Sequence, residues 1–113
     1  MAECWLLRER EVLASVEVAD SFLARGRGLL GLDGFDGAML LPHTKAVHTL
    51  GMRFAIDVAF LDKNLVVVDV VQMGTWRIGL PRLRARSVLE AEAGAFERWN
   101  LQSGDRLELK GSG

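Results

Sequence analysis

The chain has 113 residues, of which 50% are apolar and 26% are charged, a length and composition typical of one globular domain. Its 14 basic and 15 acidic residues nearly cancel, which excludes a global attraction to nucleic acid or to anionic lipid. A single cysteine excludes an internal disulfide and a cysteine-rich zinc site, and no apolar window reaches the ~18 residues of a membrane span.

The first ten residues lack the pattern of a secretory signal. Glu3 stands where positive charge is expected, and Arg8 interrupts the apolar run. Together with the single cysteine, this predicts a cytoplasmic protein in a reducing compartment. The two histidines, His43 and His48, lack the spacing of a zinc site. We expect no cofactor, no metal, and neither a membrane nor nucleic acid as partner, and we leave the oligomeric state open.

Alternating apolar positions and turn residues predict seven or eight short strands with one or two short helices. In the first half we expect a hairpin, a glycine-rich helix and two strands, at residues 4–18, 21–31, 37–42 and 45–50. In the second half we expect a hairpin, an arginine-rich loop, a strand, a short helix and a last strand, at residues 55–73, 74–87, 87–94, 95–100 and 103–110. No strand–helix–strand repeat is visible, so we predict one mainly antiparallel β sandwich or partly closed barrel over residues 1–110, with a frayed end at 111–113.

The stretch "VHTLGMRFAIDVAFLD", residues 47–62, alternates as a strand does but also carries polar residues. In an extended conformation one face would hold six apolar side chains, with His48 at its edge. The opposite face would hold Thr49, Arg53 and Asp57. One interpretation is a surface ion pair beside a core-edge histidine, and the other is a cleft on which these polar groups converge. The spacing alone fits both.

Three other motifs give little indication of function. The glycines of "ARGRGLLG", residues 24–31, have the spacing of a dinucleotide-binding loop, but no buried strand precedes them and no suitably placed acid follows. Trp76 stands among arginines and could stack on a nucleotide base, yet one basic patch in a neutral domain is a weak sign. Cys4 lies at the start of an apolar strand, where a thiol is normally inert packing.

Four segments, "RGRGLLG", "VHTLGMRFAIDVAFLD", "SVLEAEAG" and "LQSGDRLEL", resemble in order a family of small bacterial and archaeal proteins known as domain of unknown function 192. The family's pattern falls here on Arg25, Gly28, Leu29, Leu30, His48, Thr49, Met52, Ile56, Asp57, Phe60, Val88, Leu89, Glu90, Gly94, Gly104 and Asp105. The chain departs from it at Leu30, where methionine is common, and at Ala55, where proline often stands. The resemblance implies a β sandwich of jelly-roll-like appearance, and it implies no established activity.

The resemblance gives the cleft more weight than the spacing alone does, and a buried structural ion pair accounts for the same residues, because charged groups near a core are costly unless they are paired. We therefore expect the domain to bind a small polar or anionic ligand, or a peptide, between the helix of residues 21–31 and the strand of residues 47–61. The predicted ligand-binding residues are Arg25, His48, Thr49, Met52, Asp57 and Glu90. In this arrangement Arg25 holds the anion, while Asp57 and Glu90 orient the arginine.

Two alternatives stay open. The first is a hydrolase or lyase in which Asp57 or Glu90 acts with His48 as acid and base, although the sequence favours a binding protein over an enzyme. The second is a structural or interaction module without a ligand. There, Arg25 and one of the two carboxylates would form a buried ion pair that ties the helix to the sheet.

Overall fold

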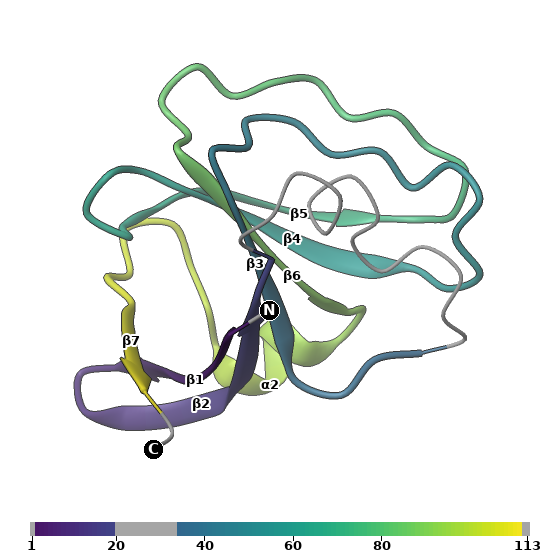
Figure 1. Cartoon of the computed structure of the whole chain (residues 1–113). Coiled ribbons are helices and arrows are strands. Elements are labelled where there is room, and N and C mark those ends of the chain that lie inside the picture. Colours follow the sequence, from purple (N-terminus) through teal and green to yellow (C-terminus); the bar gives the residue numbers. More distant parts are fainter. Residues whose placement is uncertain (1, 20–33, 112–113) are drawn as a thin grey trace.

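The computed structural model describes residues 2–19 and 34–111, which form a mainly β fold with one short helix (Figure 1). The strands are β1 (Ala2–Arg8), β2 (Glu11–Val18), β3 (Ala38–Pro42), β4 (Ile56–Leu61), β5 (Val67–Met73), β6 (Ser87–Glu92) and β7 (Glu108–Gly111), and the helix is α2 (Ala95–Trp99). The predicted fold class is confirmed, and both predicted hairpins are present as β1–β2 and β4–β5. The predicted helix at 21–31 lies outside the described residues.

The seven strands of the described chain form one sheet in the order β5-β4-β6-β3-β2-β1-β7. Neighbouring strands pair antiparallel, except that β2 and β3 are parallel. The sheet curls until its two ends meet. There, the backbone N–H of Val67 donates to the carbonyl of Asp105 at 2.8 Å, and the N–H of Leu107 donates to the carbonyl of Leu65 at 2.9 Å. The fold thus combines the two packed layers of a sandwich with the curvature of a partly closed barrel.

The three central strands β3, β4 and β6 are buried on both faces, because alternating residues enter two separate cores. On β6, Leu89 and Ala91 belong to the inner core, which the curled sheet and α2 enclose, whereas Val88 belongs to the outer core. The outer core is covered by the long connections 43–55 and 74–86, which run side by side (Figure 1). Burial on two faces explains why these strands read as nearly continuous apolar runs.

One of these two connections contains residues 45–50, which the sequence predicted to form a strand. Residues 45–50 do not form a strand, and His48 makes only an isolated bridge with Ile78. Backbone hydrogen bonds instead join residues 43–50 to residues 76–86 in antiparallel fashion. We call these two segments the cap ribbon. The apolar alternation at 45–50 therefore reflects packing on the outer core rather than a place in the sheet.

Candidate functional site

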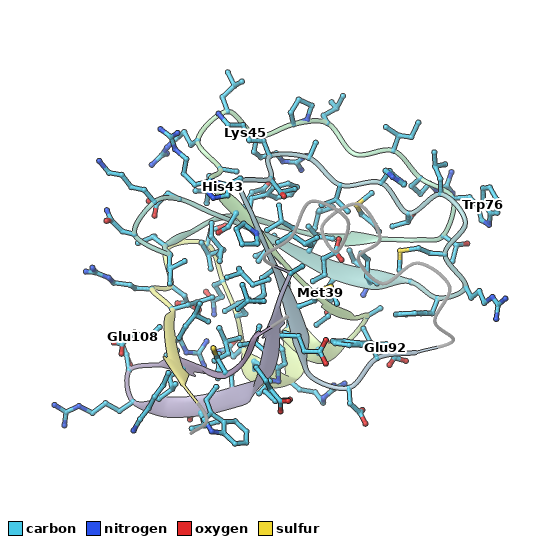
Figure 2. All side chains as sticks on the ribbon, in the orientation of Figure 1. Met39, His43, Lys45, Trp76, Glu92 and Glu108 are labelled. Carbon is cyan, nitrogen blue, oxygen red and sulfur yellow. The ribbon has the colours of Figure 1, made fainter. Side chains whose placement is uncertain are left out.

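Glu90 is a carboxyl group buried in the middle of the sheet. β6 places it between Met39 of β3, labelled in Figure 2, and Val58 of β4, on the face of the outer core. The residue is 5% exposed, and no hydrogen bond or ion pair joins it to another residue in the described parts of the chain. Burial raises the pKa of Glu90 from 4.5 to about 7, because desolvation disfavours the charged form. Near neutral pH this group is therefore poised between its two protonation states.

Asp57, the other predicted carboxylate, caps the short helix. Its Oδ2 accepts hydrogen bonds from the backbone N–H of Gly94 at 2.9 Å and of Phe96 at 3.0 Å. Its Oδ1 accepts from Nε2 of Gln72 at 3.2 Å. The first N–H groups of a helix have no partner within it, and the N-cap residue Gly94 has no side chain to supply one. The carboxylate of β4 therefore satisfies these donors and ties α2 to the sheet.

The two carboxylates lie on opposite faces of the sheet. Asp57 pairs with Ala91, an inner-core residue, whereas Glu90 pairs with Val58, an outer-core residue. Directly paired residues of neighbouring strands share a face. One cleft therefore cannot hold both carboxylates, contrary to the convergence that the sequence suggested, and the two groups cannot act together on one substrate.

Thr49 is fully buried and holds a turn of the cap ribbon. Its Oγ1 donates to the carbonyl of Gly74 at 2.6 Å and accepts from the backbone N–H of Arg77 at 2.8 Å. The contacts of Thr49 support a structural role rather than contact with a ligand.

The remaining predicted residues are dispersed. Met52 packs in the outer core at 5% exposure. His48 is exposed rather than at a core edge, and its Nδ1 accepts a hydrogen bond from the N–H of Leu50 at 3.2 Å. The predicted common face of residues 48–60 holds only from Ile56 onward, where β4 begins. Arg25 lies outside the described residues, so the anion-binding role assigned to it stays a prediction.

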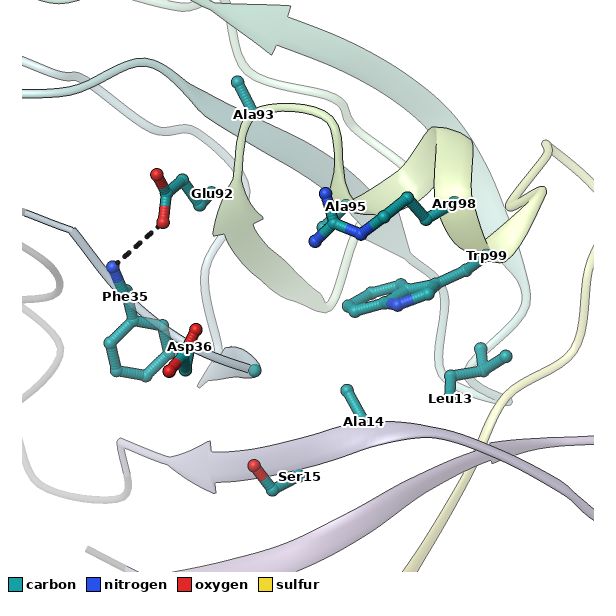
Figure 3. A pocket seen from close by; sticks show the side chains of 11 residues that line it. Leu13, Ala14, Ser15, Phe35, Asp36, Glu92, Ala93, Ala95, Arg98 and Trp99 are labelled. Atoms are coloured by element: carbon teal, nitrogen blue, oxygen red, sulfur yellow. Dashed lines mark hydrogen bonds between the residues drawn. The ribbon is translucent and has the colours of Figure 1, made fainter.

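A cavity of about 380 Å³, which the sequence did not predict, opens beside α2 (Figure 3). Three parts of the chain line the cavity. They are the strand β2, the separate segment of residues 34–37, and the end of β6 together with α2. Its lining residues are Leu13, Ala14, Ser15, Phe35, Asp36, Gly37, Glu92, Ala93, Ala95, Arg98 and Trp99. The parallel pairing of β2 with β3 brings the first two parts together, and local sequence patterns do not indicate a pairing of this kind.

Gly37 allows the close approach of these two parts. It has a φ of 82°, and a Cβ at this position would lie 2.6 Å from the carbonyl oxygen of Ser15. Any other residue would therefore be strained in its backbone and would push β2 away. The glycine keeps the floor of the cavity intact.

The cavity brings opposite charges together, and most of its exposed lining is polar. Arg98 and Trp99 approach from α2, and Phe35 and Asp36 face them from the opposite side (Figure 3). Glu92 lies beside Phe35, and its Oε2 accepts a hydrogen bond from the backbone N–H of Phe35 at 3.3 Å. Within the described residues Arg98 forms no ion pair, so its guanidinium donors are open to a ligand.

The profile of the DUF192 family, described as "Uncharacterized ACR, COG1430", matches residues 6–109. UPF0127 protein PH1112 of Pyrococcus horikoshii is 37% identical over 98 residues, which are 82% of this chain and 85% of that protein. UPF0127 protein PF1050 of Pyrococcus furiosus is 36% identical over 104 residues, 88% of this chain and 90% of that protein.

Two crystal structures share the fold. A protein of unknown function from Novosphingobium aromaticivorans superposes with a TM-score of 0.77 at 16% identity, over 94% of this chain and 83% of that chain. A protein from Sinorhizobium meliloti 1021, described as a "putative transcription regulator", superposes with a TM-score of 0.78 at 20% identity. The match covers 95% of this chain and 92% of that chain. At these identities the likeness establishes the fold alone. The family match covers nearly the whole chain, and the protein belongs to the DUF192 family of uncharacterised bacterial and archaeal proteins.

Proposed function

We infer that the domain binds a small polar ligand that carries both a carboxylate and an ammonium group, such as a free amino acid or the end of a short peptide. The ligand would occupy the cavity that is enclosed by the strand β2, the segment of residues 34–37 and the helix α2. The class of ligand is the one that the sequence suggested, but the location differs. The observation that carries the proposal is an arginine, Arg98, that forms no ion pair within the described residues and faces two carboxylates across a mostly polar cavity.

The volume and lining suit a ligand of this size. About 380 Å³ falls within the range of about 300–1,000 Å³ that is usual for small-molecule sites. Such sites combine apolar walls with a few polar groups that fix orientation. Here most of the exposed lining is polar, and Leu13, Phe35 and Trp99 add a smaller apolar share, which suits a small polar ligand.

The charges favour a zwitterion over a simple anion. Arg98 can donate two parallel hydrogen bonds to a carboxylate, which is the geometry that guanidinium groups recognise best. Asp36 and Glu92 can accept from an ammonium group, and together they outweigh the single positive charge. A ligand that carries only negative charge would meet net repulsion, whereas one that carries both charges can satisfy both sides.

Binding can be measured by titrating ¹⁵N-labelled protein with the free amino acids and a set of dipeptides. Analogues with an acetylated amine or an amidated carboxylate remove one ligand charge at a time. Arg98→Gln is expected to weaken binding by about tenfold to a hundredfold, as for loss of a charge-assisted hydrogen bond. The matched control is Arg10→Gln, an exposed arginine in the turn between β1 and β2 that should leave affinity unchanged.

The titration separates the possible results. Binding that requires both ligand charges and fails in Arg98→Gln supports the proposal. If no member of the panel binds, or if the Arg98→Gln and Arg10→Gln proteins bind equally well, the cavity does not serve this function.

A further inference from the structure

The cap ribbon exposes a row of large apolar side chains. Between residues 76 and 83, Trp76 is 67% exposed, Ile78 75%, Leu80 76% and Leu83 83%. A globular domain rarely exposes such side chains in a contiguous group unless they contact something. An open groove of about 580 Å³ runs beside them, between the ribbon and β5. This surface is separate from the Arg98 cavity.

The same ribbon carries only positive charge. Residues 43–50 and 76–86 hold five of the chain's 14 lysine and arginine residues and none of its 15 acidic residues. The cations are Lys45, Arg77, Arg82, Arg84 and Arg86. The net charge of −1 for the whole chain conceals this local excess. In Figure 2, Lys45 and Trp76 mark distant points on the outer rim of the molecule, so the basic and apolar side chains extend along the rim.

The ribbon presents these side chains on a fixed backbone. The N–H of Trp76 donates to the carbonyl of Thr49 at 2.9 Å, and the N–H of Gly79 donates to the carbonyl of Val47, also at 2.9 Å. A Cβ at position 79 would lie 2.8 Å from that carbonyl oxygen. Trp76 itself has a φ of 58°, an unfavourable conformation for a residue with a Cβ. Strain of this kind is retained where the surroundings hold it in place, and here it keeps an indole directed outward.

We propose that the cap ribbon docks the domain onto an anionic lipid surface. Lys45, Arg77, Arg84 and Arg86 would contact lipid phosphates, whereas Arg82 is already paired with Asp69 of β5 at 3.0 Å. Trp76, Ile78, Leu80 and Leu83 would enter the boundary between headgroups and acyl chains. The net charge near zero predicted no membrane partner. Docking depends on local charge instead. It is also distinct from spanning, and no helix among the described residues is long and apolar enough to cross a bilayer.

The residue types favour lipid over other anionic partners. Single strands of nucleic acid are bound through aromatic stacking, and three of the four exposed large apolar side chains between residues 76 and 83 are aliphatic. A protein partner is usually anchored by one or two side chains in packed pockets. Apolar side chains distributed along a rim, with cations interleaved, match an extended flat surface better.

Sedimentation with vesicles tests the proposal. The protein should bind vesicles of phosphatidylcholine and phosphatidylglycerol in equal parts, bind phosphatidylcholine alone much more weakly, and dissociate as salt is raised. The double variant Arg77→Gln/Arg84→Gln should lose about fivefold in affinity for each arginine removed. The apolar variant Leu80→Ser/Leu83→Ser should also bind more weakly. Its control is Val12→Ser, which changes an aliphatic side chain that is 54% exposed at the far hairpin.

A fluorescence measurement keeps the test independent of folding. Trp76 emission should shift to shorter wavelength on mixing with anionic vesicles, and the shift should be absent in Trp76→Phe. Absence of binding to anionic vesicles at low salt would overturn the proposal and leave the surface to an acidic protein. Equal loss in Val12→Ser and Leu80→Ser/Leu83→Ser would overturn it as well.

Discussion

Replacing Glu90 by glutamine should make the protein more stable at neutral and alkaline pH. Glutamine has nearly the shape of the protonated carboxyl group, so the variant imitates the form that the buried site favours. The pKa of Glu90 rises from 4.5 in the unfolded chain to about 7 in the fold. The folded state therefore binds more protons than the unfolded state between these values, and stability falls as pH rises through this window.

The size of the effect follows from the same shift. Each factor of ten in proton affinity corresponds to about 1.4 kcal/mol, so a shift from 4.5 to about 7 corresponds to about 3 kcal/mol. Below about pH 4.5 the wild type and Glu90→Gln should have similar free energies of unfolding. Above about pH 7 the variant should be more stable by up to about 3 kcal/mol, because the wild type must then hold a buried charge.

Urea denaturation between about pH 4 and about pH 9 measures this difference as a function of pH. The control is Glu92→Gln, which changes an exposed glutamate two residues further along the same strand. It should keep the pH dependence of the wild type. The reasoning is refuted if Glu90→Gln is destabilising throughout the range, since that result would mean that an ionised Glu90 is stabilised in the fold.

Two further variants test the structural roles assigned to predicted site residues. Asp57→Ala leaves the N–H groups of Gly94 and Phe96 without their acceptor and should cost about 2–5 kcal/mol in urea denaturation, whereas Asp57→Asn, which keeps an oxygen, should cost less. Equal stability of wild type and Asp57→Ala would show that α2 does not depend on this carboxylate. Thr49→Val preserves shape but removes both hydrogen bonds of Oγ1, and it should cost about 1–3 kcal/mol and shift the indole N–H resonance of Trp76. An unchanged indole resonance would mean that the turn at residues 74–77 is held by other contacts.

Local patterns were sufficient to predict most strands. The hairpin formed by β4 and β5 follows from β-branched runs around the turn at 62–64, and the short helix α2 follows from "AFERWN". The prediction of a strand at 45–50 is wrong, because a connection that packs on a core shows the same apolar alternation as a strand. The hydrogen bonds that distinguish the two come from residues 76–86, about thirty positions away.

The candidate site depended on information that lies between distant segments. The sequence placed Asp57 and Glu90 near the core, and both are buried, but the face that each occupies is set by the register of β4 against β6. A shift of one residue in this register would move the side chains of a strand to the opposite face of the sheet. No local sequence pattern specifies the register. The Arg98 cavity depends on the parallel pairing of β2 with β3, which places residues 34–37 opposite α2. The one sign of the cavity in the local sequence was Gly37, which directly follows Phe35 and Asp36.

Mapping backbone and indole chemical shifts during the amino acid titration tests the central claim most directly. Binding in the cavity should move the resonances of Gly37, Glu92 and Arg98 and the indole N–H of Trp99, in a saturable manner and only with ligands that carry both charges. Shifts confined to the neighbourhood of Glu90 and Met39, or no shifts at all, would contradict the assignment of the binding site to this cavity.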